Sequence, residues 1–381
     1  MGSRLKLFRL KKPFETEKSN DLFLRAMREN CAYHYAHCPE YRQILDEAGF
    51  SPDDLREYDD IAKMPPLPTL FFKRHHIYSM PRRRTLIHAT SSGTSGQFSD
   101  IRFDTGGLWA GLQMVITVAK QRHLLSPRPC HYIVMGYRPH RSNKTAIAKT
   151  AYGYTLFAPA LSRTFALKYA DGKYTPDLDG VIDAIVRHSR ARFPTRFIGF
   201  PAYTWFVMKL MKERGISVRL PKHSIIMLGG GWKQFYREQV DKREFYEMAE
   251  RVLGVPEDHI VEAFGAAEHP ILYCDCAHHH FHVPVYSRVI IRDVNTLEPV
   301  KNGRIGLVNL LTPMVRATPI QSIMTDDLGI LHDGQECPCG IDAPYLEIIG
   351  RVGLKDIKTC AAGAGEILTA AVAGTDKEGM A

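Results

Sequence analysis

Apolar residues recur at helical spacing near the start of the chain and again at regular intervals after residue 100. Residues 21–47 place Leu22, Met27 and Tyr35 on related faces, which predicts one amphipathic helix. Residues 64–73 contain three prolines, and the residue before a proline avoids the helical region. We therefore expect an extended chain at least up to Pro68.

After residue 107, runs with helical periodicity alternate with short apolar runs. Helices are predicted at 108–121, 181–189, 203–214 and 234–253, and strands at 131–135, 197–199, 224–228 and 260–264. Such alternation predicts an α/β domain with a largely parallel sheet. Beyond residue 282 the pattern changes to hairpin strands at 283–292 and 306–312 with a turn around Asn295, which predicts an antiparallel subdomain.

Composition and charge exclude several classes of protein. With 45% hydrophobic and 24% charged residues among 381, the chain is typical of globular proteins and not of disordered or fibrous ones. No apolar run approaches the ~20 residues of a membrane-spanning helix, and the first residues lack the core of a signal peptide, so we expect a cytoplasmic protein. The net charge of +9 fits anionic partners, but the basic residues 81–84 lack interleaved aromatic side chains, so we expect no nucleic acid partner.

Residues 90–97, with the sequence TSSGTSGQ, are the most informative segment, and strand character follows at 101–103. Glycines permit tight turns whose N–H groups can surround phosphate oxygens, and hydroxyl groups add donors without bulk. The segment lacks the Lys-Ser/Thr ending of a Walker-type loop. It therefore predicts either a phosphate-binding loop of another class or a flexible connection.

Three later segments place glycines or carboxylates where predicted strands end or turn. They are the triple glycine Gly229, Gly230 and Gly231, the run Phe264, Gly265, Ala266, Ala267 and Glu268, and a predicted turn at 324–329 with Asp326 and Asp327. Taken singly, the triple glycine also fits a helix-capping turn, Glu268 a surface glutamate, and residues 324–329 an ordinary β-turn. Because the carboxyl ends of parallel strands meet at one edge of a sheet, their combination favours a ligand site there.

In combination, these segments resemble the motifs of the adenylate-forming enzymes, which activate a carboxylate with ATP as an acyl-AMP and release pyrophosphate. The runs that carry the resemblance are SSGTSG at 91–96, FGAAE at 264–268 and TDDLG at 325–329. A narrower similarity, to the branch of phenylacetate-CoA ligases and luminescence-type acyl-protein synthetases, is carried by residues 65–73, 229–233 and 336–340. The resemblance covers about residues 60–355.

This resemblance implies an α/β fold and a set of site residues. Residues 1–350 would form the family's adenylating domain, with mixed sheets and the hairpin subdomain, and 351–381 a short tail in place of a second domain. The triple glycine would pack beside adenine, Asp327 and Arg351 would bind the ribose, and Glu268 would engage Mg²⁺. The ATP-binding residues would be Ser91, Ser92, Gly93, Thr94, Ser95, Gly96, Gly229, Gly230, Gly231, Phe264, Gly265, Asp327 and Arg351.

The sequence departs from the family's motifs at three positions. Ala266 and Ala267 replace the usual Met-Thr pair, which removes one hydroxyl contact, and Asp326 replaces a glycine. The lysine that neutralises the phosphates would be Lys73, Lys355 or Lys358.

Cys360 lies where acyl-protein synthetases carry the cysteine that receives the acyl group as a thioester. The positive charges of Lys355 and Lys358 would lower its thiol pKa and raise its nucleophilicity at neutral pH. The alternative is a cysteine without a role in the reaction.

Eight cysteines in a chain of this class favour a metal site over disulfides. The predicted ligands are Cys276, His282, Cys337 and Cys339. A closed structural site for Zn²⁺ takes four nitrogen or sulfur ligands. Cys274 or a histidine at 278–280 could replace one of the four, and a group of reduced, buried thiols is the alternative to metal.

The expected function is ATP-dependent activation of a carboxylic acid, preferably a fatty acid, followed by transfer to a protein thiol. Coenzyme A is the alternative acceptor, and a nucleotide-binding scaffold without turnover is the further alternative. Residues 197–205 and Trp232 would line or border the acid pocket, whose walls suit aromatic and aliphatic acids alike.

Overall fold

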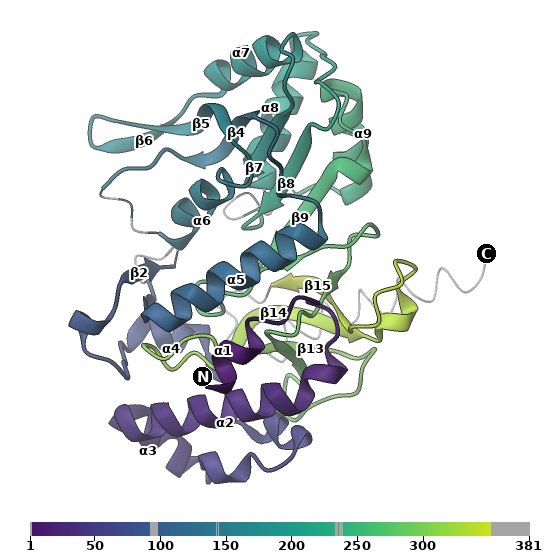
Figure 1. The fold of residues 1–381 in the computed structure, drawn as a ribbon. Coiled ribbons are helices and arrows are strands. Elements are labelled where there is room, and N and C mark those ends of the chain that lie inside the picture. Colours follow the sequence, from purple (N-terminus) through teal and green to yellow (C-terminus); the bar gives the residue numbers. More distant parts are fainter. Residues whose placement is uncertain are drawn as a thin grey trace.

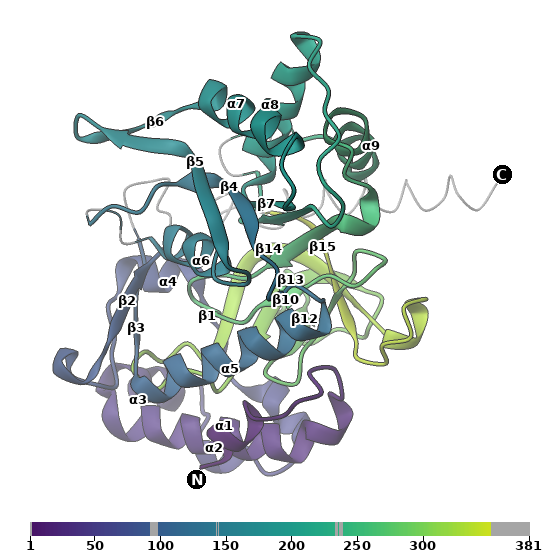
Figure 2. The same cartoon turned by 45° about the horizontal axis from the view of Figure 1, so that its top comes forward.

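The computed structural model describes residues 2–91, 98–141, 143, 145–232, 235 and 239–351. A seven-stranded sheet lies in the upper half of the molecule in Figure 1, and a six-stranded sheet lies below it, with helix α5 (Thr105–Gln121) running between the two halves. The N-terminal helices cover the lower end of the molecule in both views (Figures 1 and 2).

The seven-stranded sheet has the strand order β10-β9-β8-β7-β4-β5-β6. Its strands are β4 (Cys130–Tyr137), β5 (Ala160–Ala170), β6 (Lys173–Pro176), β7 (Thr195–Gly199), β8 (Ile225–Gly229), β9 (Ile260–Phe264) and β10 (Tyr273–Cys274). The five central strands are parallel, which confirms the predicted α/β domain, and the edge strands β6 and β10 run antiparallel to their neighbours. The β5–β6 hairpin was not predicted.

Alternating side chains of each central strand enter two different cores. On β4, Ile133 and Met135 pack with α7 (Leu178–Ser189), α8 (Pro201–Glu213) and α9 (Lys242–Leu253). Tyr132 and Val134 join the other core, which includes α5 and α6 (Ala146–Tyr154). Because both faces are covered, the strands have continuous apolar runs, and this is the pattern that revealed them in the sequence.

The six-stranded sheet confirms the predicted antiparallel subdomain. Its strands are β11 (Phe281–His282), β15 (Tyr345–Arg351), β14 (Ser322–His332), β13 (Ile305–Leu311) and β12 (Arg288–Arg292), in that order, with β1 (Leu67–Pro68) parallel to β14. The turn predicted at 324–329 is wrong, because these residues lie inside β14. Pairing with β13 on one side and β15 on the other outweighs the local turn preference of Asp and Gly.

A two-stranded ribbon of β2 (Ile87–Thr90) and β3 (Asp100–Phe103) flanks the Ser/Gly-rich segment. The strand predicted at 101–103 is thereby confirmed. The chain is extended up to Pro68, as expected, and α4 (Thr69–Arg74) begins immediately after it. Short 3₁₀ helices occupy Glu17–Ser19, Pro52–Asp54, Tyr58–Lys63, Arg82–Arg84, Glu257–His259 and Gly334–Glu336.

Two predicted helices have different bounds in the structure. Residues 21–47 form α2 (Asn20–His37) and α3 (Pro39–Glu47), not one helix, because Cys38 precedes a proline and is extended. The helix predicted from 234 begins at Lys242, where the side chain of Asp241 caps it by accepting from the Arg243 N–H. A further helix, α1 (Ser3–Leu7), opens the chain. Among the described residues, no helix combines the length and apolar character needed to cross a membrane.

Candidate nucleotide and metal sites

The carboxyl ends of β8 and β9 lie at the same edge of the parallel sheet, as their in-register pairing requires. After β8, Gly230 and Gly231 have φ angles of 81° and 64°, in the left-handed region that favours glycine. After β9, a Cβ on Gly265 would lie 2.9 Å from the carbonyl oxygen of Ile271. Any residue other than glycine would therefore force the backbone to move. Both predicted turns therefore present bare backbone at the edge.

Glu268 lies in the turn after β9 and is only 4% exposed. Its Oε1 accepts a hydrogen bond of 2.5 Å from the hydroxyl of Ser99, which is fully buried. Ser99 in turn pairs with Ser91, since the Ser99 N–H donates to Ser91 Oγ at 2.9 Å and the Ser91 N–H donates to Ser99 O at 3.1 Å. The structure thus brings Glu268 to the base of the predicted phosphate loop.

Several predicted residues lie outside the described part of the chain. They are Ser92, Gly93, Thr94, Ser95 and Gly96 of the phosphate loop, and Lys355, Lys358 and Cys360 near the C-terminus.

Asp327 and Arg351 face each other as cross-strand partners of β14 and β15, as a shared ribose site requires. Arg351 Nη2 lies 3.4 Å from Asp326 Oδ2, and its Nε lies 3.8 Å from Asp327 Oδ1. The guanidinium is 63% exposed, so this ion pair is open to a ligand.

α4 adds two side chains to this region. The Thr69 hydroxyl donates to Asp326 Oδ1 at 3.3 Å. Lys73 follows Thr69 by one helical turn and therefore lies on the same face of α4. The structure places this lysine on the helix that contacts the acidic pair.

A groove of about 1100 Å³ opens beside the ribbon, with Thr90 and Phe98 from either side of the Ser/Gly-rich segment in its wall. Its cationic lining residues are Arg82, Arg102, Lys149 and Lys173. Asp100 is the acidic residue in the wall, and it is engaged by the hydroxyl of Tyr78 at 2.8 Å and by Arg102 at 3.5 Å. The groove therefore favours an anionic occupant.

Aromatic rings continue from this groove along the carboxyl edge of the sheet. Their centroids are separated by 4.9 Å for Tyr174 and Tyr137, 6.3 Å for Tyr137 and Phe200, 6.0 Å for Phe200 and Tyr203, and 5.8 Å for Tyr203 and Phe235. Phe200 and Tyr203 belong to the segment predicted to line the acid pocket. The same segment's Phe197 and Trp205 instead pack in the core under α7–α9, because β7 and α8 alternate their faces.

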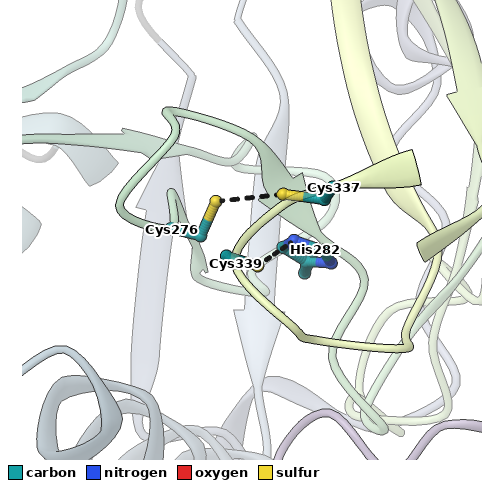
Figure 3. Close-up of side chains that lie close together, drawn as sticks. All are labelled: Cys276, His282, Cys337 and Cys339. Carbon is teal, nitrogen blue, oxygen red and sulfur yellow. Dashed lines mark hydrogen bonds between the residues drawn. The ribbon is translucent and has the colours of Figure 1, made fainter. Parts of the chain in front are cut away.

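The four predicted metal ligands converge on one point, with donor atoms all within 4.8 Å of one another (Figure 3). Cys276 Sγ lies 3.7 Å from Cys337 Sγ, and Cys339 Sγ lies 3.1 Å from His282 Nε2. Two sulfurs on a tetrahedral zinc with bonds of ~2.3 Å are separated by about 3.8 Å. The measured sulfur separation matches that value.

His282 is already oriented as a metal ligand. Its Nδ1 lies 2.7 Å from the carbonyl oxygen of Ala343, which can only accept, so the proton is on Nδ1 and the lone pair of Nε2 faces the sulfurs. Of the alternative ligands, His280 has its Nδ1 3.0 Å from Cys337 Sγ. Cys274 is buried in β10 and is not part of the group.

The Cys/His cluster lies at the opposite end of β15 from Arg351 and its cross-strand partner Asp327. Tyr345 packs against the cluster at the start of the strand, and Arg351 ends it. Six residue steps of ~3.4 Å put the two ends about 20 Å apart. The cluster therefore lies well away from Asp327 and Arg351.

Two contacts of the site were not predicted from the sequence. Ser99 and Thr69 each bond a carboxylate of a motif more than 160 residues away. Ser99 follows the resembling run by three positions, and Thr69 is an ordinary first residue of a helix, so no local pattern distinguishes either one.

The comparisons with known proteins agree with this geometry. Residues 9–369 match the model of the family described as Acyl-protein synthetase, LuxE. A long-chain-fatty-acid luciferin-component ligase of Aliivibrio fischeri is 26% identical over 348 residues, which cover 91% of this chain and 88% of that protein. A phenylacetate-coenzyme A ligase of Thermus thermophilus is 24% identical over 331 residues, which cover 83% of this chain and 67% of that protein.

Among solved structures, a 2-hydroxyisobutyryl-CoA ligase in complex with 2-HIB-AMP resembles the chain with a TM-score of 0.67. The match covers 90% of this chain and 70% of that one, at 15% identity. At this identity the similarity shows a shared fold, and it confirms the expected architecture of an adenylate-forming enzyme.

Proposed function

Because the chain belongs to the acyl-protein synthetase family, it is an ATP-dependent, AMP-forming carboxylate ligase, and we propose that it activates a fatty acid and transfers the acyl group to a protein thiol. The observation that carries the proposal is the contact of the buried Glu268 carboxylate with Ser99. Ser99 in turn bonds Ser91, at the start of the Ser/Gly-rich segment. Residues 1–350 form the proposed adenylating domain.

In the first half-reaction, a carboxylate oxygen of the acid attacks the α-phosphorus of ATP, and the bond to pyrophosphate breaks. Both reactants are anions, so the site must position them and neutralise charge, and it needs no covalent nucleophile. We assign the phosphates to Ser91 and the following residues up to Gly96, the adenine to the triple glycine, and the ribose to Asp327 with Arg351. Lys73 supplies the positive charge toward the phosphates in this assignment.

Glu268 is the proposed ligand for Mg²⁺, which supplies charge neutralisation at the phosphates when bound. The donor set fits this ion, because Mg²⁺ in nucleotide enzymes takes one or two carboxylates and completes its octahedron with phosphate oxygens and water. Ser99 engages Oε1 of this carboxylate, and a hydroxyl-rich segment follows Ser91.

The row of aromatic rings supports an apolar acid. Tyr137, Phe200 and Tyr203 present large, weakly polar surfaces at the carboxyl ends of β4 and β7, where an acyl chain can be shielded from water. One relative is named for long-chain fatty acids, and this favours that class over short polar acids.

In the second half-reaction, a thiolate attacks the acyl carbonyl and AMP leaves. Cys360 is the proposed acceptor within the chain. We expect Cys360→Ala to form acyl-AMP at the normal rate and to lose a hydroxylamine-labile acyl adduct on the protein, followed with a radiolabelled acid. An adduct that persists in this variant contradicts the assignment of Cys360.

The Cys/His cluster is the proposed site of a structural Zn²⁺. Its three sulfurs and one imidazole are the donor set that zinc prefers in closed sites, and the sulfur separation of 3.7 Å supports it. Zinc at this point would tie the turn before β11 to the turn before β15.

Coenzyme A is the second candidate acceptor, and the cationic groove favours it. Arg82, Arg102, Lys149 and Lys173 suit the phosphates of such a molecule, and the groove flanks the Ser/Gly-rich segment. Coenzyme A-dependent release of AMP from the preformed acyl-adenylate, unaffected by Cys360→Ala, would favour this acceptor over the protein thiol.

Exchange of pyrophosphate into ATP tests the activation chemistry before any acceptor is known. We expect exchange that depends on a fatty acid and is absent with short polar acids. ATP binding without exchange for any acid in a panel of fatty, aryl and hydroxy acids would contradict the proposal and favour a nucleotide-binding scaffold.

A further inference from the structure

The contact between Ser99 and Glu268 joins two segments that are 169 residues apart in the chain. The hydroxyl donates to Oε1 at 2.5 Å, and both side chains are shielded from water. A hydrogen bond to a carboxylate is stronger in such surroundings than at the surface. This contact therefore restrains the direction in which the carboxylate points.

Ser99 also closes the base of the Ser/Gly-rich segment. Its backbone exchanges two hydrogen bonds with Ser91, of 2.9 and 3.1 Å, which tie Ser99 to the residue that precedes the run 92–97. The Ser99 side chain extends from this pair to Glu268. One residue thus connects Ser91, where the segment begins, to the carboxylate.

The backbone of the Glu268 turn is fixed on its other side by His269. This fully buried ring has its Nε2 3.2 Å from the Tyr273 hydroxyl and 3.1 Å from the Ser287 hydroxyl. Ala266 and His269 also exchange backbone hydrogen bonds across the turn. With the backbone held, the Glu268 side chain is restrained by Ser99.

We propose that Ser99 is a positioning residue for adenylation, which holds Oε1 of Glu268 so that the other carboxylate oxygen faces the cation bound with the ATP phosphates. The inference rests on the proposed role of Glu268 and adds the residue that orients it. Mg²⁺ demands near-ideal octahedral geometry, so a carboxylate that rotates freely binds it less well. Removing such an outer partner of a metal ligand typically costs about 10–100-fold in affinity or activity.

Ser99→Ala tests the inference through binding, without the reaction. We expect it to weaken ATP binding by about 10–100-fold when Mg²⁺ is present and much less in EDTA, measured by calorimetry without an acid substrate. Ser99→Thr keeps the hydroxyl and should restore the magnesium-dependent affinity. Ser224→Ala is the matched control, because Ser224 is a buried hydroxyl immediately before β8, at its amino end.

A double-mutant cycle with Glu268→Gln separates positioning from general damage. If Ser99 acts through Glu268, Ser99→Ala should add little to the loss that Glu268→Gln causes. The inference would be overturned if Ser99→Ala lowered the ATP affinity of Glu268→Gln as much as it lowers that of the wild type. It would also be overturned if Ser99→Ala alone had normal magnesium-dependent ATP affinity. Should Ser99→Ala not fold, Ser99→Cys replaces it, because a thiol of similar shape is a weak donor and should shift the affinity in the same direction.

The proposed function and the inference fail differently. Normal magnesium-dependent ATP affinity in Glu268→Gln would overturn the role of Glu268 and the inference with it. If Glu268→Gln loses magnesium-dependent ATP affinity and Ser99→Ala keeps it, the inference is overturned and the proposed function stands.

Discussion

The Cys/His cluster and the turns at the carboxyl edge of the parallel sheet are both assembled from distant segments, but they are held in opposite ways. Cys276, His282, Cys337 and Cys339 come from two segments of the chain, 276–282 and 337–339, and their donor atoms all lie within 4.8 Å of one another (Figure 3). At the carboxyl edge, glycine turns follow β8 and β9, and single polar contacts such as the one between Ser99 and Glu268 join distant segments.

The difference fits the roles proposed for the two regions. A structural metal stays bound, so its ligands are most effective when they are already converged and oriented, as the His282 bond to Ala343 shows. A nucleotide enters and leaves in every cycle, and the open backbone and the exposed, loosely paired guanidinium at Arg351 suit the nucleotide site proposed at this edge. We therefore expect changes in the cluster to affect stability and changes at the edge to affect turnover.

The largest expected effect is on turnover, from Glu268→Gln. Removing the charge without changing the volume should lower pyrophosphate exchange by about 10²–10³-fold, the range found when one preorganised electrostatic contact is lost. Glu262→Gln, in the preceding strand β9 and paired with Lys242 at 2.9 Å, is the control and should keep most of the activity. Equal rates of pyrophosphate exchange in the two variants would contradict a special role for Glu268.

The next effect is on stability, from Cys337→Ala. Loss of a zinc ligand should cost about 3 kcal/mol or more in the free energy of unfolding, since metal binding contributes to folding directly. Cys130→Ala deletes a fully buried thiol outside the cluster and should cost only about 1–2 kcal/mol for its cavity. Denaturant unfolding and zinc content measure both. Equal destabilisation with no zinc in the wild-type protein would contradict the metal assignment.

A smaller effect on substrate binding is expected from Asp327→Asn. Loss of a charge-assisted hydrogen bond to the ribose should raise the KM for ATP about tenfold and change kcat little. Asp333→Asn serves as the control, because Asp333 lies just beyond β14 and bonds Asn302. A fall in kcat with an unchanged KM would show that Asp327 acts in the reaction and not in binding.

The smallest effect is expected in the groove, from Lys173→Glu combined with Arg82→Glu. Both side chains are exposed and neither is assigned to the ATP phosphates, so pyrophosphate exchange should change less than about twofold. If coenzyme A is the acceptor, its KM should rise several-fold and depend on salt. Identical coenzyme A kinetics in the variant and the wild type would exclude the groove as its site.

Much of this arrangement could be predicted from the sequence because it is local. Continuous apolar runs such as 131–135 identified the central strands, and the glycines after 228 identified a turn at the sheet's edge. Prediction failed where long-range pairing outweighed local preference. Asp326 and Asp327 favour a turn but lie in β14, since β13 and β15 bond that strand on both sides.

The sequence by itself determined the family motifs, the alternation of helices and strands, and the identity of the four candidate zinc ligands. Only the tertiary structure decided that Ser99 hydrogen-bonds Glu268, that Thr69 contacts Asp326, and that His282 turns its lone pair toward three sulfurs. The physical reason is the range of the interactions. Periodicity and turn chemistry act over a few residues, whereas each of these contacts depends on how whole sheets and helices pack.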